Sequence, residues 1–273
     1  MEEDDWLLDR LLAEGPPVPA RGYYLPAVDR CWPHAGPRQP VDIFRSAELF
    51  SDVLSGVERT FAQRRSRSAS RGWQAKFPSK RMARTLRARS HLELRLLELC
   101  EVDARVARFV EQPICILYAD ADGDRRKHIP DLYLEVEGRG FFVEVKWERD
   151  AAHTKNESRW PCIGRAINGL GFGYEVLTER HILRRPRADN VANLLRHRRS
   201  DAMDARLQSA LRNTLAHGDL SFADVASTWP DITSSSLYRA LTDGWLWTDL
   251  DCDLGPNSQL RLVRLPTRSA QCD

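Results

Sequence analysis

The chain lacks the features that mark several common classes of protein. None of its 273 residues belong to an apolar run near the ~20 residues that span a bilayer. The N-terminus, MEEDDWLLDRLL, is acidic and amphipathic, without the basic start of a signal peptide. The six cysteines include no CxxC pair, which argues against a zinc ribbon and against a disulfide scaffold. A single CxxH, Cys31 with His34, has no second pair to complete a metal site. We therefore expect an intracellular protein without membrane contacts.

Acidic residues are missing from one long segment. Between Ala62 and Leu92 there is no Asp or Glu, although the whole chain has a net charge of only +2. The cations of this basic block are Arg64, Arg65, Arg67, Arg71, Lys76, Lys80, Arg81, Arg84, Arg87 and Arg89. Such one-sided charge is typical of a surface that binds a polyanion, and a solvated basic linker is the alternative. Trp73, Phe77 and Met82 lie inside the block and favour its attachment to a core.

Residues 61–180 are expected to form an α/β domain. Leucines recur at helical spacing in 91–101, and Ser90 with Glu93 has the pattern of a capping box. Segments with strand character are 113–118, 131–136, 141–147 and 172–178, and a helical segment is 158–170. Helices and strands that alternate in this order indicate a single α/β domain.

The flanking segments have a different character. Residues 1–60 are expected to be an arm rich in Pro and Gly followed by one helix. Residues 181–273 are expected to be a polar connector and a winged-helix domain, because three helical segments precede a hairpin. Its third helix, SSSLYRALTDG, is the expected recognition helix but offers only Arg239 as a cation, whereas a helix that reads the major groove usually carries more. We therefore expect this domain to dock a protein partner.

The stretch IPDLYLEVEGRGFFVEVKWE predicts a β-hairpin that carries two acids and a lysine. Alternation puts Asp131, Glu144 and Lys146 on one face of the sheet. A turn at Gly138-Arg139 would pair Asp131 with Lys146, at a Cβ distance of ~5 Å. The same turn would pair Tyr133 with Glu144. A surface salt bridge on a solvated sheet face is the plainer interpretation.

Two carboxylates and an ammonium this close suit a metal-dependent phosphodiesterase. Mg²⁺ prefers hard oxygen ligands, which Asp131, Glu144 and the carbonyl of Val145 would supply. The ion would lower the pKa of a bound water and neutralise the phosphate. Lys146 would orient or help deprotonate the attacking water, or stabilise the pentavalent charge.

These residues also carry a family resemblance. Pro130-Asp131 followed by Glu144-Val145-Lys146 resembles the motif of the PD-(D/E)xK nuclease superfamily. A longer stretch, over roughly residues 70–180, resembles the TnsA-type endonuclease subunit of heteromeric transposases. The segments that carry this resemblance are FPSKRMARTLRARSHLELRLLELCEVDARVARFVEQPICILY, RKHIPDLYLEV and FFVEVK. The resemblance implies a restriction-endonuclease-like core with Glu93, Asp131 and Lys146 as the catalytic set. Glu144 fills a position that varies among relatives.

The resemblance further implies the metal ligands and the role of the helix acid. The ligands would be Glu93, Asp131, Glu144 and the Val145 carbonyl. Glu98 and Glu101 compete with Glu93 for the catalytic role, and helix capping is the alternative role for Glu93. Glu93 is favoured because Leu97 and Cys100, four and seven residues further on, lie on the same face of the helix and turn that face toward packed residues.

The implied function is that of a Mg²⁺-dependent DNA endonuclease, with Mn²⁺ as a substitute, that cuts the 5′ strand ends of a transposon. Its implied partners are double-stranded DNA at the transposon ends, a DDE-type transposase subunit and an AAA+ ATPase that the C-terminal domain engages. The implied location is the bacterial cytoplasm, with association to the nucleoid during activity. A stand-alone restriction- or repair-type nuclease and a non-enzymatic DNA-binding adaptor are the alternatives.

Basic residues near the site are expected to neutralise DNA phosphates. The expected DNA contacts are Lys76, Lys80, Arg81, Arg84, Gln112, Arg126 and Lys127. Gln112 has an equal alternative as a strand-entry residue. For the neighbours Arg125, Arg126, Lys127 and His128, the alternative is a solvated turn.

Overall fold

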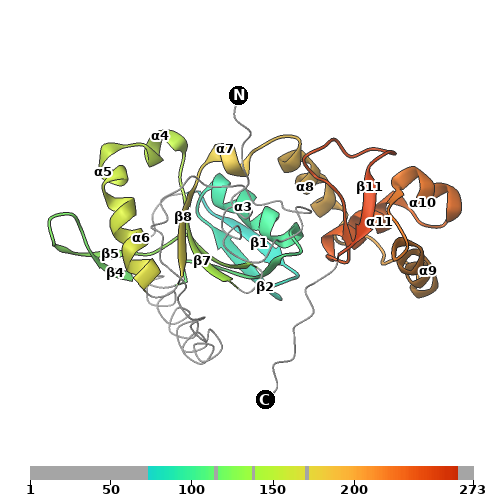
Figure 1. Cartoon of the computed structure of the whole chain (residues 1–273), viewed down its shortest axis with the longest axis horizontal. Helices are drawn as coiled ribbons and strands as arrows, with labels where there is room; N and C mark the ends of the chain where they lie inside the picture. The colour runs from blue at the N-terminus through green and yellow to red at the C-terminus, as the bar shows by residue number, and fades with distance from the viewer. Residues whose placement is uncertain (1–72, 114–115, 137–138, 170–171, 264–273) are drawn as a thin grey trace, which may run out of the picture.

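The structure is a computed structural model that describes residues 73–113, 116–136, 139–169 and 172–263 (Figure 1). The arm and helix expected in 1–60 lie outside the described residues, as do the Cys31 and His34 pair and the first four arginines of the basic block. None of the helices in the described ranges has both the length and the apolar character needed to cross a membrane.

The described part of the basic block is a hairpin. Strand β1 (Ala75–Ser79) pairs antiparallel with β2 (Arg84–Ala88), so that Phe77 lies opposite Leu86. Both side chains are buried, whereas Lys76 and Arg87 on the other face are exposed. The alternation of cations with apolar residues thus attaches the block to the core and turns its charges outward.

Helix α3 (His91–Val102) follows the hairpin as predicted. The Ser90 side chain caps it by accepting a hydrogen bond from the Glu93 N–H at 3.1 Å. Leu92, Leu96 and Leu99 are buried, as their spacing predicts. The helix therefore presents an apolar face to the central sheet.

The central sheet has four strands in the order β3-β6-β7-β8: β3 (Val106–Glu111), β6 (Leu132–Val136), β7 (Arg139–Val145) and β8 (Gly173–Leu177). Strands β7 and β8 are parallel and the other neighbours are antiparallel. The prediction for β6, β7 and β8 is confirmed. Strand β3 was not predicted, because a register shift between Val106 and Arg108 interrupts its alternation.

The predicted hairpin register is wrong by two residues. Val136 pairs with Arg139, so only residues 137 and 138 separate the strands, and Arg139 belongs to β7. Leu132 pairs with Val143, and one further step along this register brings Asp131 opposite Glu144. A shift of two residues preserves the face of every side chain, because the strand period is two.

Both faces of the sheet are covered. Leu134 and Val143 share a core cluster with Leu96 of α3, while Tyr133 and Phe142 on the other face pack with Ile163. Ile163 belongs to α6 (Arg159–Gly169), which confirms the helix predicted over 158–170. Figure 1 shows α6 and α3 on opposite sides of the sheet. The acids therefore do not lie on a solvated sheet face, and the interpretation as a surface salt bridge is wrong.

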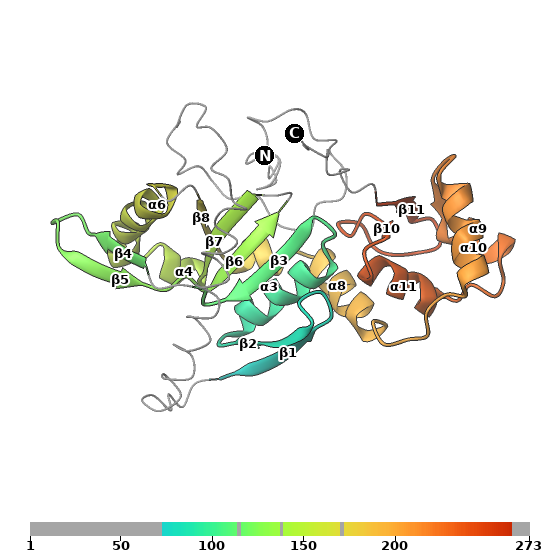
Figure 2. The same ribbon diagram turned by 90° about the horizontal axis from the view of Figure 1, so that it is seen from below.

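A second hairpin adjoins α6. Strand β4 (Ile116–Ala119) pairs antiparallel with β5 (Arg125–His128), so the basic run before Asp131 is a strand rather than a turn. Two short helices, α4 (Glu148–Ala151) and α5 (Thr154–Glu157), connect β7 to α6. Figure 2 shows this β4–β5 layer beyond α6, at the opposite end from the C-terminal elements.

The segment expected to be a polar connector contains two helices, α7 (Glu179–Ile182) and α8 (Arg187–Arg196). Val191 and Leu194 of α8 are fully buried, and the helix contacts α3 and α11. The many charged residues of α8 made the segment look like a polar connector, but its apolar residues form one buried face. The connector prediction is therefore wrong for this segment.

The C-terminal elements are α9 (Ala205–Leu215), β9 (Leu220–Ser221), α10 (Phe222–Thr228), α11 (Ser234–Thr242), β10 (Leu246–Trp247) and β11 (Gln259–Leu262). The strands form a sheet in the order β10-β11-β9, which contains the predicted hairpin. Trp229, Trp245 and Trp247 pack against the main core, which favours a role in packing.

Candidate active site

Asp131, Glu144 and Lys146 meet at one end of the β6–β7 pair. The Lys146 Nζ lies 2.6 Å from Glu144 Oε1 and 3.3 Å from Asp131 Oδ2. Glu144 is 4% exposed, so the cluster lies at the edge of the protein interior. Two acids and the lysine predicted to converge are thus in direct contact.

The backbone holds Asp131 from two sides. Its Oδ2 accepts a hydrogen bond from the Val145 N–H at 2.9 Å, and its carbonyl accepts one from the Gln112 N–H at 2.8 Å. Gln112 follows the end of β3, with a positive φ of 44°, and does not begin a strand. The Val145 carbonyl, a predicted metal ligand, accepts from Lys146 Nζ at 3.2 Å.

Glu93 approaches the cluster from α3. Its Oε2 accepts a hydrogen bond from the Arg89 N–H at 2.9 Å. In the predicted capping box this carboxylate would instead accept from the N–H of the N-cap residue, Ser90. Its charge contributes to the raised pKa of Asp131. Of its competitors, Glu98 pairs with Arg95 and Glu101 accepts from Ser79. Glu93 is therefore the helix acid whose charge reaches the site.

Sequence reasoning missed the role of His128, which it had grouped with the phosphate-binding cations. The buried His128 places Nε2 3.0 Å from Glu144 Oε2. On its other side, Arg159 Nη2 lies 3.0 Å from His128 Nδ1. The proximity of His128 to Pro130-Asp131 was visible in the sequence, but its contact across to β7 depends on how β5 packs.

The charges in the cluster are unequally compensated. Burial and then the Glu144 charge raise the pKa of Asp131 to about 7. Burial alone would raise the pKa of Glu144, but the close contact with His128 and the Lys146 charge outweigh burial, so this pKa lies below its ordinary value. For Lys146, burial is outweighed by the two carboxylates, which raise its pKa. Asp131 thus binds its proton unusually tightly for a carboxyl.

These residues fit a hard divalent cation in the kind of donor they offer. The cluster contains carboxylate oxygens and the Val145 carbonyl, the ligand types that Mg²⁺ prefers. The pKa of Asp131 is raised because its negative charge is not fully compensated, so a cation bound beside it would be stabilised. The arrangement is not a preformed cage, since no group of three or more His, Cys, Asp or Glu side chains within the described ranges is placed to hold a metal.

Several expected DNA contacts are engaged within the protein. Arg81 donates to the carbonyls of Val106 at 2.6 Å and Glu101 at 3.1 Å. Arg84 forms a two-fold contact with Glu111, at 3.0 and 2.6 Å. These contacts give both arginines a role in the fold and do not favour their predicted DNA contacts.

The two lysines of the same hairpin remain at the surface. Lys76 and Lys80 are exposed, and Lys80 pairs with Asp243 at 3.1 Å. Their DNA contacts stay predictions.

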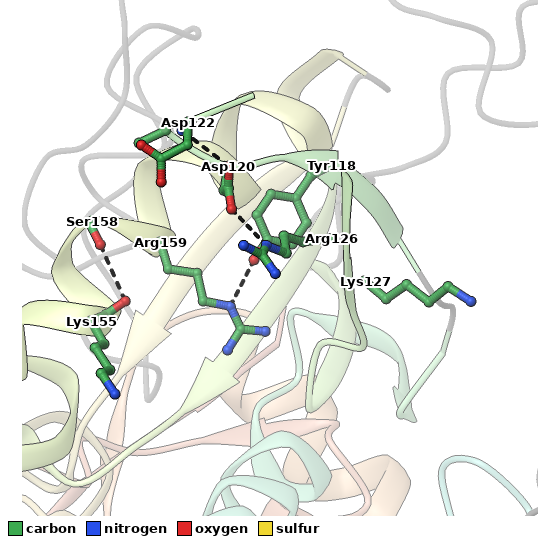
Figure 3. Close-up of a pocket in the computed structure, with 9 residues that line it drawn as sticks. Tyr118, Asp120, Asp122, Arg126, Lys127, Lys155, Ser158 and Arg159 are labelled. Atoms are coloured by element: carbon green, nitrogen blue, oxygen red, sulfur yellow. Dashed lines mark hydrogen bonds and ion pairs between the residues drawn. The ribbon is translucent and has the colours of Figure 1, made fainter. Parts of the chain in front are cut away.

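A pocket of about 600 Å³ lies between the β4–β5 hairpin and the start of α6 (Figure 3). Its lining residues are Tyr118, Asp120, Ala121, Asp122, Arg126, Lys127, Lys155, Ser158 and Arg159. Arg126 pairs with Asp120 at 2.6 Å and Asp124 at 3.1 Å. Arg159 donates to the Tyr118 hydroxyl at 3.0 Å and also reaches His128, so one side chain joins the pocket to the acid cluster.

The mixed sheet between helices, with a PD element just before β6 and an ExK element at the end of β7, is compatible with a nuclease fold of the PD-(D/E)xK type. Residues 103–179 match the family described as TnsA-like endonuclease N terminal. This segment therefore belongs to the TnsA-like endonuclease family, as the resemblance predicted. The match covers Asp131, Glu144 and Lys146, and Glu93 precedes it. It makes this part of the chain an endonuclease domain, which implies a DNA substrate and a transposase partner. A comparison with curated proteins found no match.

Proposed function

We propose that the protein is the Mg²⁺-dependent endonuclease subunit of a heteromeric transposase and cuts the 5′ strand at each transposon end. The observation that carries this proposal is the convergence of Asp131, Glu144 and Lys146 inside the segment that matches the family. The alternative of a non-enzymatic adaptor is disfavoured, because an adaptor has no need of buried, mutually repelling carboxylates.

In this proposal Glu93, Asp131, Glu144 and the Val145 carbonyl would hold the ion. When bound, the ion would activate the attacking water and neutralise charge on the scissile phosphate. Asp131 is held by the Val145 N–H and so would keep its orientation through the reaction. The Lys146 ammonium, which already contacts both acids, would orient the water or stabilise the developing negative charge.

Exposed cations on two sides of the site would bind the DNA backbone. Lys76 and Lys80 project from the β1–β2 hairpin, and Lys127 and Lys155 line the pocket beside β5. Contacts from lysines to phosphates carry no sequence information, so these contacts would position the duplex and make its binding salt-dependent. Sequence preference for the transposon end would then come from the partner transposase.

The C-terminal elements would form a winged-helix domain that docks the AAA+ ATPase. Its order of three helices and a three-stranded sheet supports this fold. The cation of α11, Arg239, pairs with Asp243 at 3.2 Å and also donates to the Ser200 carbonyl. With Arg239 so engaged, α11 is poorly equipped to read bases, which favours a protein partner. A cytoplasmic, nucleoid-associated location in bacteria belongs to the same proposal.

Strand cleavage on labelled transposon ends tests this function. We expect Mg²⁺-dependent nicking of the 5′ strand that rises strongly when the partner transposase is added, with Mn²⁺ as a working substitute. Asp131→Ala and Lys146→Ala should abolish nicking while the far-ultraviolet circular dichroism and duplex binding are retained. Undiminished nicking by Asp131→Ala would refute the assignment.

The same assay separates the two alternatives. Equal cutting of generic duplexes by the protein alone would favour a stand-alone restriction- or repair-type nuclease. Metal binding without any cutting, in the presence of the transposase, would favour an adaptor.

A further inference from the structure

We infer that His128 and Arg159 act as a positioning pair, in which Arg159 sets the tautomer of His128 so that the protonated ring nitrogen, Nε2, is the one in contact with Glu144. This inference deepens the proposed nuclease function and rests on it for its consequences in catalysis. Neither residue belongs to the acid and lysine set that the sequence motif defines. His128 belongs to β5 and Arg159 to α6. Both elements lie on the side of the sheet opposite α3.

The hydrogen-bonding groups around His128 decide its tautomer. A guanidinium has only N–H donors and no acceptor. Arg159 Nη2 lies 3.0 Å from His128 Nδ1, so Nδ1 must present its lone pair. In the neutral ring the proton is then on Nε2, which lies 3.0 Å from Glu144 Oε2. The arginine thereby selects the form of the imidazole that places its N–H, rather than a lone pair, beside the acid, in a contact that is close but not aligned as a hydrogen bond.

Packing holds the two side chains in this arrangement. The His128 ring makes edge contacts with Trp160 and Tyr174, at centroid distances of 6.5 and 6.2 Å. Arg159 is anchored by its 3.0 Å hydrogen bond to the Tyr118 hydroxyl. Side chains confined in this way lose little further entropy when they make their hydrogen bonds, so the pair is preorganised.

The consequence falls on Glu144. His128 Nε2 lies 3.0 Å from Oε2 and the Lys146 ammonium lies 2.6 Å from Oε1, so each carboxylate oxygen has one polar neighbour that limits its rotation. Loss of the histidine would free Oε2 to rotate, and the ammonium that Glu144 holds near Asp131 would lose its fixed place. Partners that orient a metal-binding carboxylate typically change metal affinity or activity by about 10- to 100-fold when removed.

The first test reads the tautomer directly and needs no catalysis. Long-range ¹H–¹⁵N correlation of the metal-free full chain should show His128 with a protonated Nε2 and an unprotonated Nδ1. In Arg159→Leu we expect the ring to become a mixture of tautomers. A His128 ring with its proton on Nδ1, or unchanged spectra in Arg159→Leu, would overturn the inference whatever the protein's activity.

The second test measures the effect on the site. In His128→Leu, calorimetry with Mg²⁺ or Mn²⁺ should show affinity lowered about 10-fold or more, with a similar loss in single-turnover cleavage. His128→Gln restores an N–H donor and should recover part of both losses. Duplex affinity without metal should stay within about two-fold, because the pair acts on Glu144 and not on DNA.

A matched control separates positioning from packing. Tyr174→Phe keeps the ring that packs on His128 and removes only a hydroxyl, so metal affinity and cleavage should stay at the wild-type level. If His128→Leu does not fold, Arg159→Leu provides the same measurements, because it keeps the histidine ring in place. Wild-type metal affinity in the folded variants, alongside an inactive Asp131→Ala, would sink the positioning role and leave the nuclease function standing.

Discussion

The ammonium of Lys146 lies 2.6 Å from Oε1 of Glu144, closer than the 3.3 Å that separates it from Asp131 Oδ2. The lysine compensates its own strand neighbour first, because residues two apart share one face of a strand. Asp131 is therefore the less compensated acid of the pair. Burial and the Glu144 charge raise the pKa of Asp131 beyond what the more distant ammonium offsets, whereas His128 and the closer ammonium together hold the pKa of Glu144 below its ordinary value.

The first prediction concerns pH. The pKa of Asp131 is about 7 in the folded protein against 3.8 for an ordinary Asp, so between these values the folded state binds more protons. Stability of the metal-free protein should fall as pH rises through this window, by at most about 1.4 kcal/mol per pH unit. Urea unfolding with a chelator, near pH 5 and near pH 8, measures the fall.

The control for this prediction is Asp131→Asn, which cannot titrate. We expect its unfolding free energy to show a distinctly weaker decline over the same pH interval. An identical decline in both proteins would show that another group is responsible.

Glu93 has two candidate roles that one substitution separates. Glu93→Gln keeps an oxygen that can accept from the Arg89 N–H but removes the charge near Asp131. If Glu93 is catalytic, cleavage should fall by about two orders of magnitude or more, with little change in stability. Single-turnover nicking and thermal unfolding are the measurements.

Ser90→Ala is the matched variant for the same helix end. It removes the cap at the Glu93 N–H and should cost about 1 kcal/mol of stability while cleavage persists. Full cleavage by Glu93→Gln would return this residue to a capping role alone.

The sheet register depends on a close approach at Gly173. A methyl group there would overlap Cδ1 of Phe141, the residue with which Gly173 pairs in β7. We expect Gly173→Ala to destabilise the protein by about 1–3 kcal/mol, because neither strand can yield without shifting the other. In Gly164→Ala the added methyl would meet Tyr174 at an ordinary 3.6 Å, so chemical denaturation should show no loss. Equal stability of the two variants would contradict the packing argument.

A buried arginine joins α8 to the loop before β11. Arg187, 1% exposed, pairs with Asp251, and Asn190 donates to the carbonyls of Leu250 and Cys252 at 2.9 and 2.8 Å. Arg187→Met should cost about 1.5–3 kcal/mol, because it removes a charge-assisted contact to the partly exposed Asp251. Arg196→Met, at an exposed position of the same helix, should change the unfolding free energy by less than about 0.5 kcal/mol. A similar small effect for Arg187→Met would show that the pair contributes little.

Local patterns in the chain were enough for the elements that carry the candidate site. Alternation over 131–136 and 141–147 predicted the two strands and the common face of Asp131, Glu144 and Lys146, and the structure agrees. Leucine spacing and Ser90 predicted α3 with Glu93 near its start. The basic run before Asp131 was harder, because a charged strand has no apolar alternation to mark it.

The sequence by itself determined which way the acids and the lysine point, because side-chain direction along a strand follows from a period of two that needs no partner. Only the tertiary structure decided which residues they meet. The hairpin register, the contact of His128 with Glu144, and the engagement of Arg81 and Arg84 by the protein each depend on elements far apart in the chain. Such contacts are settled by how the two layers pack on the sheet, which no local pattern encodes.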